Sequence, residues 1–487
     1  MYDLYVSFVN GLNGIIWSKA LVYLCLATGL YLSLRMKFPQ FRLFKEMCRL
    51  IVAKPDTDKG ITPFQSFCAT VGSRVGMGNI AGVATAIYFG GPGAVFWMWC
   101  IALIGAASAF SETALAQAYK RLGPDGVYVG GPAHFIERGV KFKPLAIAFA
   151  VMAIFGPGIM MPGVQVQSIA STFTNAFGAD PKIIGAVTVV LIALVIFGGV
   201  KRISRVAEIL APVMCIAYLI FALIITIANI TKVPGVFALI FSSAFGKNAL
   251  YGSIIGTAVQ WGVKRGVYSN EAGQGSGPII AASAECSHPA KQGLVQAGSV
   301  YIDTLLVCTC SAMIILLTGN YNVSGGETMI TENIPGVAYG ILWAQNALIG
   351  FFGGWAGKVL AVIVVIFVFT SLMGYYYQAE ANVRYLSREK KSATLIFRII
   401  FLISVFAGVL VDDEVVWSMG DIGCGGMAWF NIIGMLIISS QAIKLLKDYE
   451  QQRKAGKDPV FHPAEFGIED PDGVWDEYQK MEADGRF

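Results

Sequence analysis

The chain has 487 residues, of which 55% are apolar and 14% are charged, and its formal net charge at pH 7 is +5. Soluble domains carry about 25% charged residues, so this composition excludes an ordinary soluble protein. The small positive excess, spread over several short segments, also argues against nucleic-acid binding.

Apolar runs of about 20 residues recur along most of the chain, and each is long enough to cross a bilayer as a helix. The runs are continuously apolar rather than alternating, which excludes a transmembrane barrel. We therefore predict an all-α polytopic membrane protein with about 11 transmembrane helices. The expected spans are residues 15–34, 62–88, 92–118, 144–173, 181–200, 204–230, 249–282, 293–318, 355–378, 393–411 and 415–443.

Basic residues gather in alternate loops between these spans. Residues 35–59 contain seven Lys or Arg, residues 119–143 five, residues 201–205 three and residues 384–391 four, whereas residues 319–354 contain none. The positive-inside rule places the basic loops in the cytoplasm. We therefore expect a bacterial inner-membrane protein with its N-terminus outside and its C-terminus in the cytoplasm.

The sequence contains a weak internal repeat at an offset of 191 residues. Residues 74–82, RVGMGNIAG, align with residues 265–273, RGVYSNEAG. The two copies begin in the second and seventh spans, so they enter the membrane in opposite directions. Such inverted repeats are typical of secondary transporters with a binding site at mid-membrane between broken helices.

This repeat predicts a five-plus-five arrangement with one extra helix. The predicted units are an extra N-terminal helix with a basic cytoplasmic loop (1–61), a first repeat of five helices (62–230), an outer interfacial segment (231–248), a second repeat of five helices (249–443) and a small cytoplasmic tail (444–487).

Residues 72–82, GSRVGMGNIAG, place four glycines and Arg74 in the middle of the second span. Each glycine disfavours a helix by about 1 kcal/mol relative to alanine. A charged side chain in the middle of the bilayer costs several kcal/mol more. A local break would expose amides at one half-helix end and carbonyls at the other, which suits a carboxylate and a cation. The alternative is an unbroken helix that packs closely on its small residues. Asn79 could bond freed backbone or a ligand.

Residues 261–278, WGVKRGVYSNEAGQGSGP, predict a second break. This segment also contains several charged and polar side chains. The alternative interpretation is that it forms a solvent-exposed cytoplasmic loop. The side chains concerned are Lys264, Arg265, Glu271, Gln274 and Ser276.

Two acids fall in or near apolar spans. Asp303 lies about ten residues into the eighth span, so we expect it to bind a cation or to act as counter-ion to Arg74 or Arg265. Glu112 is expected at the cytoplasmic end of its helix, paired with a loop cation. The nine cysteines are scattered without metal-ligand spacing, so we expect no cofactor.

Three motifs resemble those of a known family. Residues 90–105, GGPGAVFWMWCIALIG, resemble the signature of the alanine or glycine:cation symporter family, the sodium/alanine symporters. GNIAGVATA (78–86) and YSNEAGQGS (268–276) also resemble that family's motifs. Cys100 stands where the signature has an aliphatic residue. The resemblance implies a broken-helix, five-plus-five inverted-repeat fold and sodium-driven uptake of alanine or glycine.

The resemblance also implies site residues. In the wider superfamily, the pattern G-x-x-V-G-x-G-N gives carbonyls to sodium and amides to the substrate carboxylate. Arg74 departs from this pattern, because its position is usually small. Thr370 and Ser371 resemble the hydroxyl pair of the superfamily's sodium site, and their alternative is back-bonding to the preceding helical turn. The matching residues of the pattern are Gly72, Val75, Gly76, Met77, Gly78 and Asn79.

The sequence therefore predicts a symporter, not an enzyme, that couples inward sodium flux to uptake of a small neutral amino acid. A proton-coupled transporter, with Asp303 or Glu271 as carrier, is the alternative. No filter motif indicates a channel, and no nucleophile with a base indicates an enzyme. The predicted residues are Gly76, Met77, Gly78, Asn79, Gln274 and Ser276 for substrate, Gly72, Val75, Thr370 and Ser371 for sodium, and Asp303, Arg74 and Glu271 as coupling or charge partners.

Overall fold

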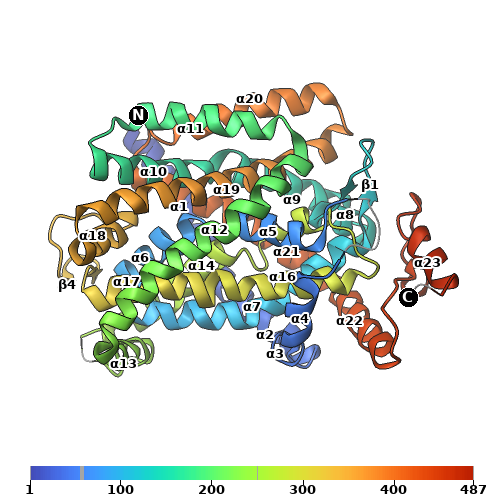
Figure 1. The fold of residues 1–487 in the computed structure, drawn as a ribbon, viewed down its shortest axis with the longest axis horizontal. Helices are drawn as coiled ribbons and strands as arrows, with labels where there is room; N and C mark the ends of the chain where they lie inside the picture. Colours follow the sequence, from blue (N-terminus) through green and yellow to red (C-terminus); the bar gives the residue numbers. More distant parts are fainter. Residues whose placement is uncertain (1, 55–59, 249, 486–487) are drawn as a thin grey trace.

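The computed structural model describes residues 2–54, 60–248 and 250–485. Long helices run side by side along one direction, and a short hairpin lies at each end of the bundle (Figure 1). The all-α polytopic prediction is confirmed. Seven stretches of described residues are long and apolar enough to cross a membrane: Tyr2–Arg35, Gly93–Ala118, Lys143–Phe177, Lys201–Ala228, Pro289–Thr318, Gly354–Ser387 and Asp413–Ile437.

The other expected spans are shorter or interrupted helices. The fifth and tenth correspond to α11 (Pro181–Ile196) and α20 (Lys391–Ala407). The second and seventh are each split in two, as the glycine-rich segments predict. Their halves are α5 (Pro63–Arg74) with α6 (Met77–Gly90), and α14 (Ile255–Asn270) with α15 (Gly277–Ala281).

The N-terminal region differs from the expected single helix and loop. Helix α1 (Tyr2–Ile16) precedes α2 (Lys19–Arg35), and it packs on α21 (Asp413–Ile437) because its apolar side chains need a partner. The basic segment contains α3 (Pro39–Arg42) and the strongly amphipathic α4 (Phe44–Ile51). Residues 1, 55–59, 249, 486 and 487 of the expected units lie outside the described residues.

Among the described residues, each predicted repeat contains five helical units. Beside α5–α6, the first contains α7 (Gly93–Ala118), α9 (Lys143–Phe155) with the π-helix η2 (Gly156–Met160) and α10 (Pro162–Phe177), α11, and α12 (Gly199–Ala228). Beside α14–α15, the second contains α16 (Pro289–Val300) with the π-helix η5 (Tyr301–Cys308) and α17 (Thr309–Thr318), α19 (Gly354–Ser387), α20 and α21.

The two broken helices lie antiparallel. At one end, the Ile61 amide donates to the Ser283 carbonyl (3.1 Å), so the start of α5 meets the exit of α15. At the other end, a Cβ on Gly90 of α6 would lie 3.0 Å from the Ala258 Cα of α14. The chain therefore passes through the two breaks in opposite directions.

The offset of 191 residues does not superimpose the two breaks. The first break lies at Val75 and Gly76, and that register would place the second at Gly266 and Val267. Both of these residues lie inside α14. The second break instead begins at Glu271, because three residues with positive φ gather there: Glu271, Gly273 and Gly275.

Helix α14 rests on α7 through glycines. A Cβ on Gly262 would lie 2.5 Å from the Ala94 carbonyl oxygen, and one on Gly266 would overlap the Ile101 side chain. The segment 90–105 thus supplies the surface against which α14 packs, in the manner of small-residue helix pairs.

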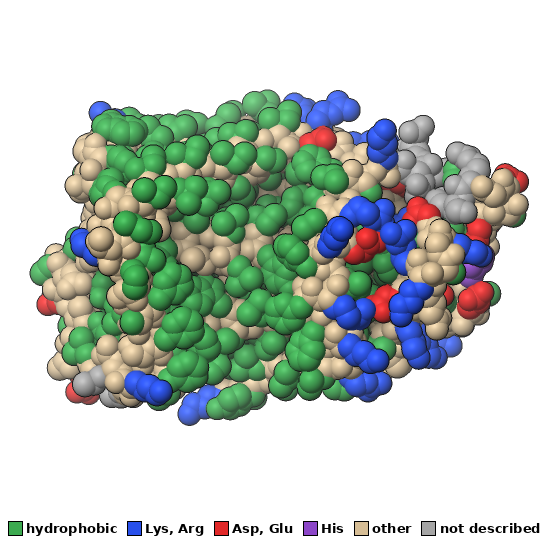
Figure 2. All heavy atoms as spheres, turned by 60° about the horizontal axis from the view of Figure 1, so that its bottom comes forward, with side chains coloured by type: hydrophobic (Ala, Val, Ile, Leu, Met, Phe, Trp, Pro, Cys, Tyr) green, Lys and Arg blue, Asp and Glu red, His purple; other side chains and the backbone are tan. Residues whose placement is uncertain are grey.

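Different elements cap the two ends of the bundle. One end carries η3 (Ile230–Lys232), α13 (Val233–Ala244), η4 (Gly252–Ile254), the hairpin β3–β4 (Asn322–Ser324, Met329–Glu332) and α18 (Ile341–Phe352). The other carries the hairpin β1–β2 (Arg121–Leu122, Tyr128–Val129), α8 (Pro132–Phe135) and the π-helix η1 (Ile136–Val140). Lys and Arg side chains gather at this second end, where the green apolar surface stops (Figure 2).

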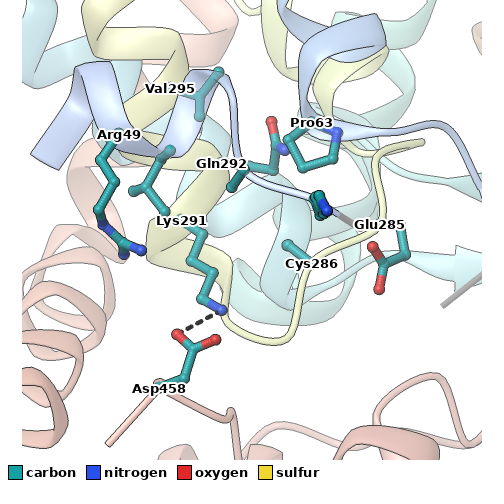
Figure 3. Close-up of a pocket in the computed structure, with 11 residues that line it drawn as sticks. Arg49, Pro63, Glu285, Cys286, Lys291, Gln292, Val295 and Asp458 are labelled. Atoms are coloured by element: carbon teal, nitrogen blue, oxygen red, sulfur yellow. Dashed lines mark ion pairs between the residues drawn. The ribbon is translucent and has the colours of Figure 1, made fainter. Parts of the chain in front are cut away.

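The tail is a packed unit and not a loose extension. It consists of α22 (Ser439–Lys454), η6 (Pro463–Phe466) and α23 (Asp476–Ala483). Tyr478 donates to Glu285 (2.6 Å), and Lys291 forms an ion pair with Asp458 (2.9 Å) across a small cavity beside α4 and α16 (Figure 3). Trp475 is only 1% exposed. The tail therefore contacts the loop between α15 and α16.

Candidate functional site: two facing helix breaks

The first break is shaped by Gly76. Helix α5 ends at Arg74 and α6 begins at Met77, and the Gly76 amide donates to Asn79 Oδ1 (3.0 Å). A Cβ on Gly76 would overlap Ser371 Oγ and lie 3.2 Å from Gln165 Oε1. Any larger residue here would displace the Ser371 hydroxyl of α19 from its present position.

The second break is held by buried polar groups. The Gly273 amide donates to Glu112 Oε1 (3.3 Å), and Asn431 Nδ2 donates to both Glu112 Oε2 (2.7 Å) and the Gly273 carbonyl (2.9 Å). Glu112 is fully buried, so its expected pairing with a loop cation is wrong. Glu112 thus provides the acceptor that the buried Gly273 amide needs in this unwound segment.

The two breaks meet at Asp303. Its carboxylate accepts from Asn79 Nδ2 (2.7 Å), Ser269 Oγ (2.8 Å) and Thr304 Oγ1 (2.7 Å). Asp303 is fully buried within the π-helix η5. The structure thus brings Asn79 of the first break together with the end of α14 around one carboxylate.

Asp303 is not an ion-pair partner of either arginine among the described residues. Arg265 pairs with Asp421 instead (2.6 Å). Arg74 donates to Ser299 Oγ (2.5 Å) and to the Gln296 carbonyl (3.3 Å). All three of the donors to Asp303 are neutral, so nothing in hydrogen-bond distance balances a charge on it.

The Arg74 guanidinium points away from the predicted sodium site. It lies against Gly277, where a Cβ would overlap its Nη2, and it reaches α16 beneath the second break. Although Arg74 departs from the superfamily pattern, its side chain therefore does not obstruct the Gly72 carbonyl.

Three of the four predicted sodium residues, Gly72, Thr370 and Ser371, lie together between α5 and α19, and Val75 caps the end of α5. Ser371 Oγ donates to the Gly72 carbonyl (3.3 Å), and a Cβ on Gly72 would lie 3.2 Å from Thr370 Cβ. Thr370 Oγ1 donates to the carbonyls of Ile366 (3.0 Å) and Phe367 (2.9 Å). Thr370 therefore adopts the back-bonding alternative, whereas Ser371 faces the break.

The predicted substrate residues lie at the same two breaks, and in this structure they form hydrogen bonds or contacts with other residues of the protein. The Met77 amide donates to Gln165 Oε1, at a long 3.3 Å. Gln274 Oε1 accepts from Cys424 Sγ (3.1 Å), and Ser276 donates to Glu271 Oε2 (2.7 Å). A Cβ on Gly78 would lie 3.1 Å from the Tyr268 ring. Met77, Gly78, Gln274 and Ser276 are all buried at the two breaks.

Glu271 ties the second break to α5 and α19. Its Oε1 accepts from Ser73 Oγ (3.4 Å), and Gln378 Nε2 lies 2.8 Å from Ser73 Oγ and 3.5 Å from Glu271 Oε2. Glu271 thus faces α5, the first half of the first broken helix.

The sequence analysis did not identify several residues of this region. Gln165 belongs to α10, where its amide also donates to the Tyr375 hydroxyl (3.2 Å). A polar side chain within an apolar span was the available signal for it. Asp421 pairs with both Lys264 (2.7 Å) and Arg265, beside a cavity of about 290 Å³ on the α14 side of the breaks.

The chain matches known transporters along nearly its whole length. The model of the "Sodium:alanine symporter family" matches residues 2–463. A putative sodium/proton-dependent alanine carrier protein YrbD of Bacillus subtilis (strain 168) is 46% identical over 475 residues, covering 97% of this chain and 98% of the relative. A probable sodium/glutamine symporter GlnT of the same organism is 41% identical and covers 92% of each chain.

A solved structure shows the same fold. MhsT, crystallised in complex with L-phenylalanine, superimposes with a TM-score of 0.54 at 15% identity, over 80% of this chain and 98% of that one. The two helix breaks and their inverted orientation are consistent with these matches to membrane transporters. The chain belongs to the sodium:alanine symporter family of multi-pass membrane transporters.

Proposed function

We propose that this protein couples inward sodium flux to the uptake of a small neutral amino acid, alanine or glycine, in the bacterial inner membrane. The N-terminus would lie outside and the basic end of the bundle in the cytoplasm. The observation that carries the proposal is the placement of the Ser371 hydroxyl on the Gly72 carbonyl, directly beside the start of α6.

The substrate carboxylate would bind the amides of Met77 and Gly78. These are the first amides of α6, which have no acceptor within their own helix and carry its positive dipole end. The Gln165 amide oxygen now accepts from Met77 only weakly, so a carboxylate oxygen can replace it. The substrate ammonium would bind carbonyls of the unwound segment 271–276, with Gln274 and Ser276 beside it.

Sodium would bind the carbonyl oxygens of Gly72 and Val75 and the hydroxyl oxygens of Thr370 and Ser371. Carbonyl and hydroxyl oxygens are hard ligands that suit hard cations. Both hydroxyls now donate to carbonyls, and rotation of each would turn a lone pair toward the ion. In this proposal the transport cycle needs no cofactor, and sodium is a transported ion.

The geometry supplies a route for coupling. A cation between Gly72 and Ser371 draws α5 and α19 together and fixes the conformation of the break. The amides of Met77 and Gly78 belong to the same break, so sodium would raise the affinity for substrate, and substrate would raise the affinity for sodium equally.

Proton coupling is the second candidate, and Asp303 favours it. This buried carboxylate has only neutral donors, so a proton or a cation must balance its charge within the membrane. The relative YrbD carries both sodium and proton in its name. Glu271, which accepts from Ser276, is the alternative carrier.

Counterflow in proteoliposomes tests the proposal. Purified protein would be offered alanine, glycine, serine and glutamine under separately imposed sodium, lithium and proton gradients. Alanine or glycine uptake driven by sodium alone supports it, and uptake driven only by protons supports the second candidate.

A double variant tests the sodium site itself. Thr370→Ala with Ser371→Ala should raise the sodium concentration for half-maximal uptake by about tenfold or more, equivalent to about 1.4 kcal/mol of lost binding. Thr188→Ala is the matched control, because its hydroxyl only bonds back to Ile184 within α11. Unchanged sodium dependence in the double variant removes the site.

A further inference from the structure

A basic cavity lies at the junction between α2, α3 and α22, far along the chain from the breaks. Its volume is about 420 Å³. The turn from α2 into α3 forms one wall and α22 forms the other. Five cationic side chains line it: Arg35, Lys37, Arg42, Lys447 and Lys454.

The cavity has an excess of positive charge. Glu450 is the acid among its lining residues, and it pairs with Arg42 at 2.7 Å. Among the described residues, Lys37, Lys447 and Lys454 form no ion pair, and Arg35 donates to the Tyr31 hydroxyl (2.9 Å). Four cations thus share one cavity without an acid to balance them, which favours an anionic ligand.

The turn that presents this wall has an uncommon backbone. Lys37 and Phe38 both have left-handed φ values, 58° and 52°, although neither is glycine. Arg42 holds the turn by donating to the carbonyls of Met36 (3.0 Å) and Lys37 (3.3 Å). Such backbone persists where surrounding contacts determine it, and it often accompanies a binding site.

Exposed apolar side chains adjoin the cavity. Leu34, at the end of the apolar stretch Tyr2–Arg35, is 56% exposed, and Phe41 of α3 is 57% exposed. Exposed aromatic and aliphatic side chains beside basic ones mark the depth at which a bilayer surface begins. Figure 2 shows Lys and Arg side chains along the margin where the apolar surface ends.

The cavity also offers apolar contacts. Met36 and Leu446 are both 3% exposed and line it together with Ile443. A free inorganic anion needs no such contacts, whereas the glycerol and first acyl carbons of a lipid do.

We propose that this cavity binds the headgroup of an anionic phospholipid of the inner leaflet. The phosphodiester lies among Lys37, Lys447 and Lys454, and the acyl chains follow the exposed face of α2 past Leu34. Basic pockets between helices on the cytoplasmic side suit this class of ligand. The bound lipid bridges the α2–α3 turn to α22 and thereby fastens the tail unit to the bundle.

Native mass spectrometry of the full-length protein tests this site. The protein would be purified in a nonionic detergent and titrated with phosphatidylglycerol, phosphatidylcholine or inorganic phosphate. The test variant is Lys37→Gln with Lys447→Gln and Lys454→Gln. The control variant removes equal charge from exposed lysines outside the cavity: Lys45→Gln, Lys141→Gln and Lys457→Gln.

The expected result is one retained phosphatidylglycerol per chain in the wild type and in the control. The test variant should bind it at least about tenfold more weakly, and its melting temperature should no longer rise with added phosphatidylglycerol. Equal retention in the test variant and the control overturns the proposal. Equal binding of phosphatidylcholine, or displacement of the lipid by millimolar phosphate, overturns it as well, because the site would then be apolar or a small-anion site.

Discussion

The side-chain amide of Asn79 lies 2.7 Å from the carboxylate of Asp303, and this hydrogen bond joins the first broken helix to the second repeat. The same Asn79 accepts from the Gly76 amide through its oxygen (3.0 Å). One side chain thus fixes the first break and contacts the buried acid of η5. A change at either residue should therefore reach both halves of the site.

Asp303→Asn should separate charge from packing at this junction. The substituted amide keeps the size of the carboxylate and can still accept from Ser269 or Thr304, so the fold should survive. Loss of the negative charge should raise the half-maximal sodium concentration at least about tenfold or abolish proton-driven uptake. Uptake against sodium concentration and pH measures both. If both dependences match the wild type, Asp303 is purely structural.

Gly76→Ala should stop transport by occupying the space of a single methyl group. The added Cβ overlaps Ser371 Oγ and crowds Gln165, so the Ser371 hydroxyl must leave its position beside the Gly72 carbonyl. We expect uptake to fall more than about tenfold while the protein still reaches the membrane. Gly82→Ala, whose nearest neighbour would be 3.7 Å away, is the control on the same helix and should retain uptake. Equal activity of the two variants would contradict this packing.

Gln165→Glu should weaken substrate binding by repulsion. The new carboxylate would lie at the Met77 amide, where the substrate carboxylate is proposed to bind, and two such anions repel each other. We expect substrate affinity to fall by about tenfold to a hundredfold, or about 1.4 to 2.8 kcal/mol. Gln165→Ala should have a smaller effect. Binding measured by calorimetry checks this, and equal losses for the two variants would exclude a charge effect.

Asp421→Asn should destabilise the fold. Asp421 is the shared ion-pair partner of Lys264 and Arg265, which are both buried, so its loss leaves two charges without a counter-ion. Removal of one partner from a buried ion pair costs about 3–5 kcal/mol. A thermal unfolding assay in detergent should show a clear decrease in melting temperature. Glu414→Gln, an exposed acid beside the same cavity, should not, and equal decreases would show that the effect is not specific.

Trp475→Ala should release the tail. The Trp475 ring is buried against Phe461, with ring centroids 4.9 Å apart, and Lys120 Nζ lies 4.6 Å above it. Replacing a buried Trp by Ala costs about 3–5 kcal/mol, here within one small unit. Limited proteolysis should then cut residues 455–485 much faster than in the wild type. An unchanged cleavage rate would show that the tail stays docked without this ring.

The sequence predicted the architecture better than the partners of its polar residues. Apolar runs and the glycines at 72–82 and 271–276 report local propensity, so the helices and both breaks could be located. The partner of Glu112 could not, because it depends on the Gly273 amide, 161 residues away, meeting it after folding. Arg74 is similar, since only the packed structure shows that it turns toward Ser299. The weak repeat identified the correct helices but misaligned their breaks, because few of its residues form them.

The glycine contact between α14 and α7 has a consequence for movement. Gly262 and Gly266 place the α14 backbone directly on Ala94 and Ile101, so no α14 side chain stands between the two helices at these positions. We expect α14 to move along α7 by small shear displacements, because such a movement needs no α14 side chain to repack at the two glycines. Residues 90–105, which carry the strongest family resemblance, would then guide this movement during alternating access. None of their side chains needs to contact the substrate or the ion.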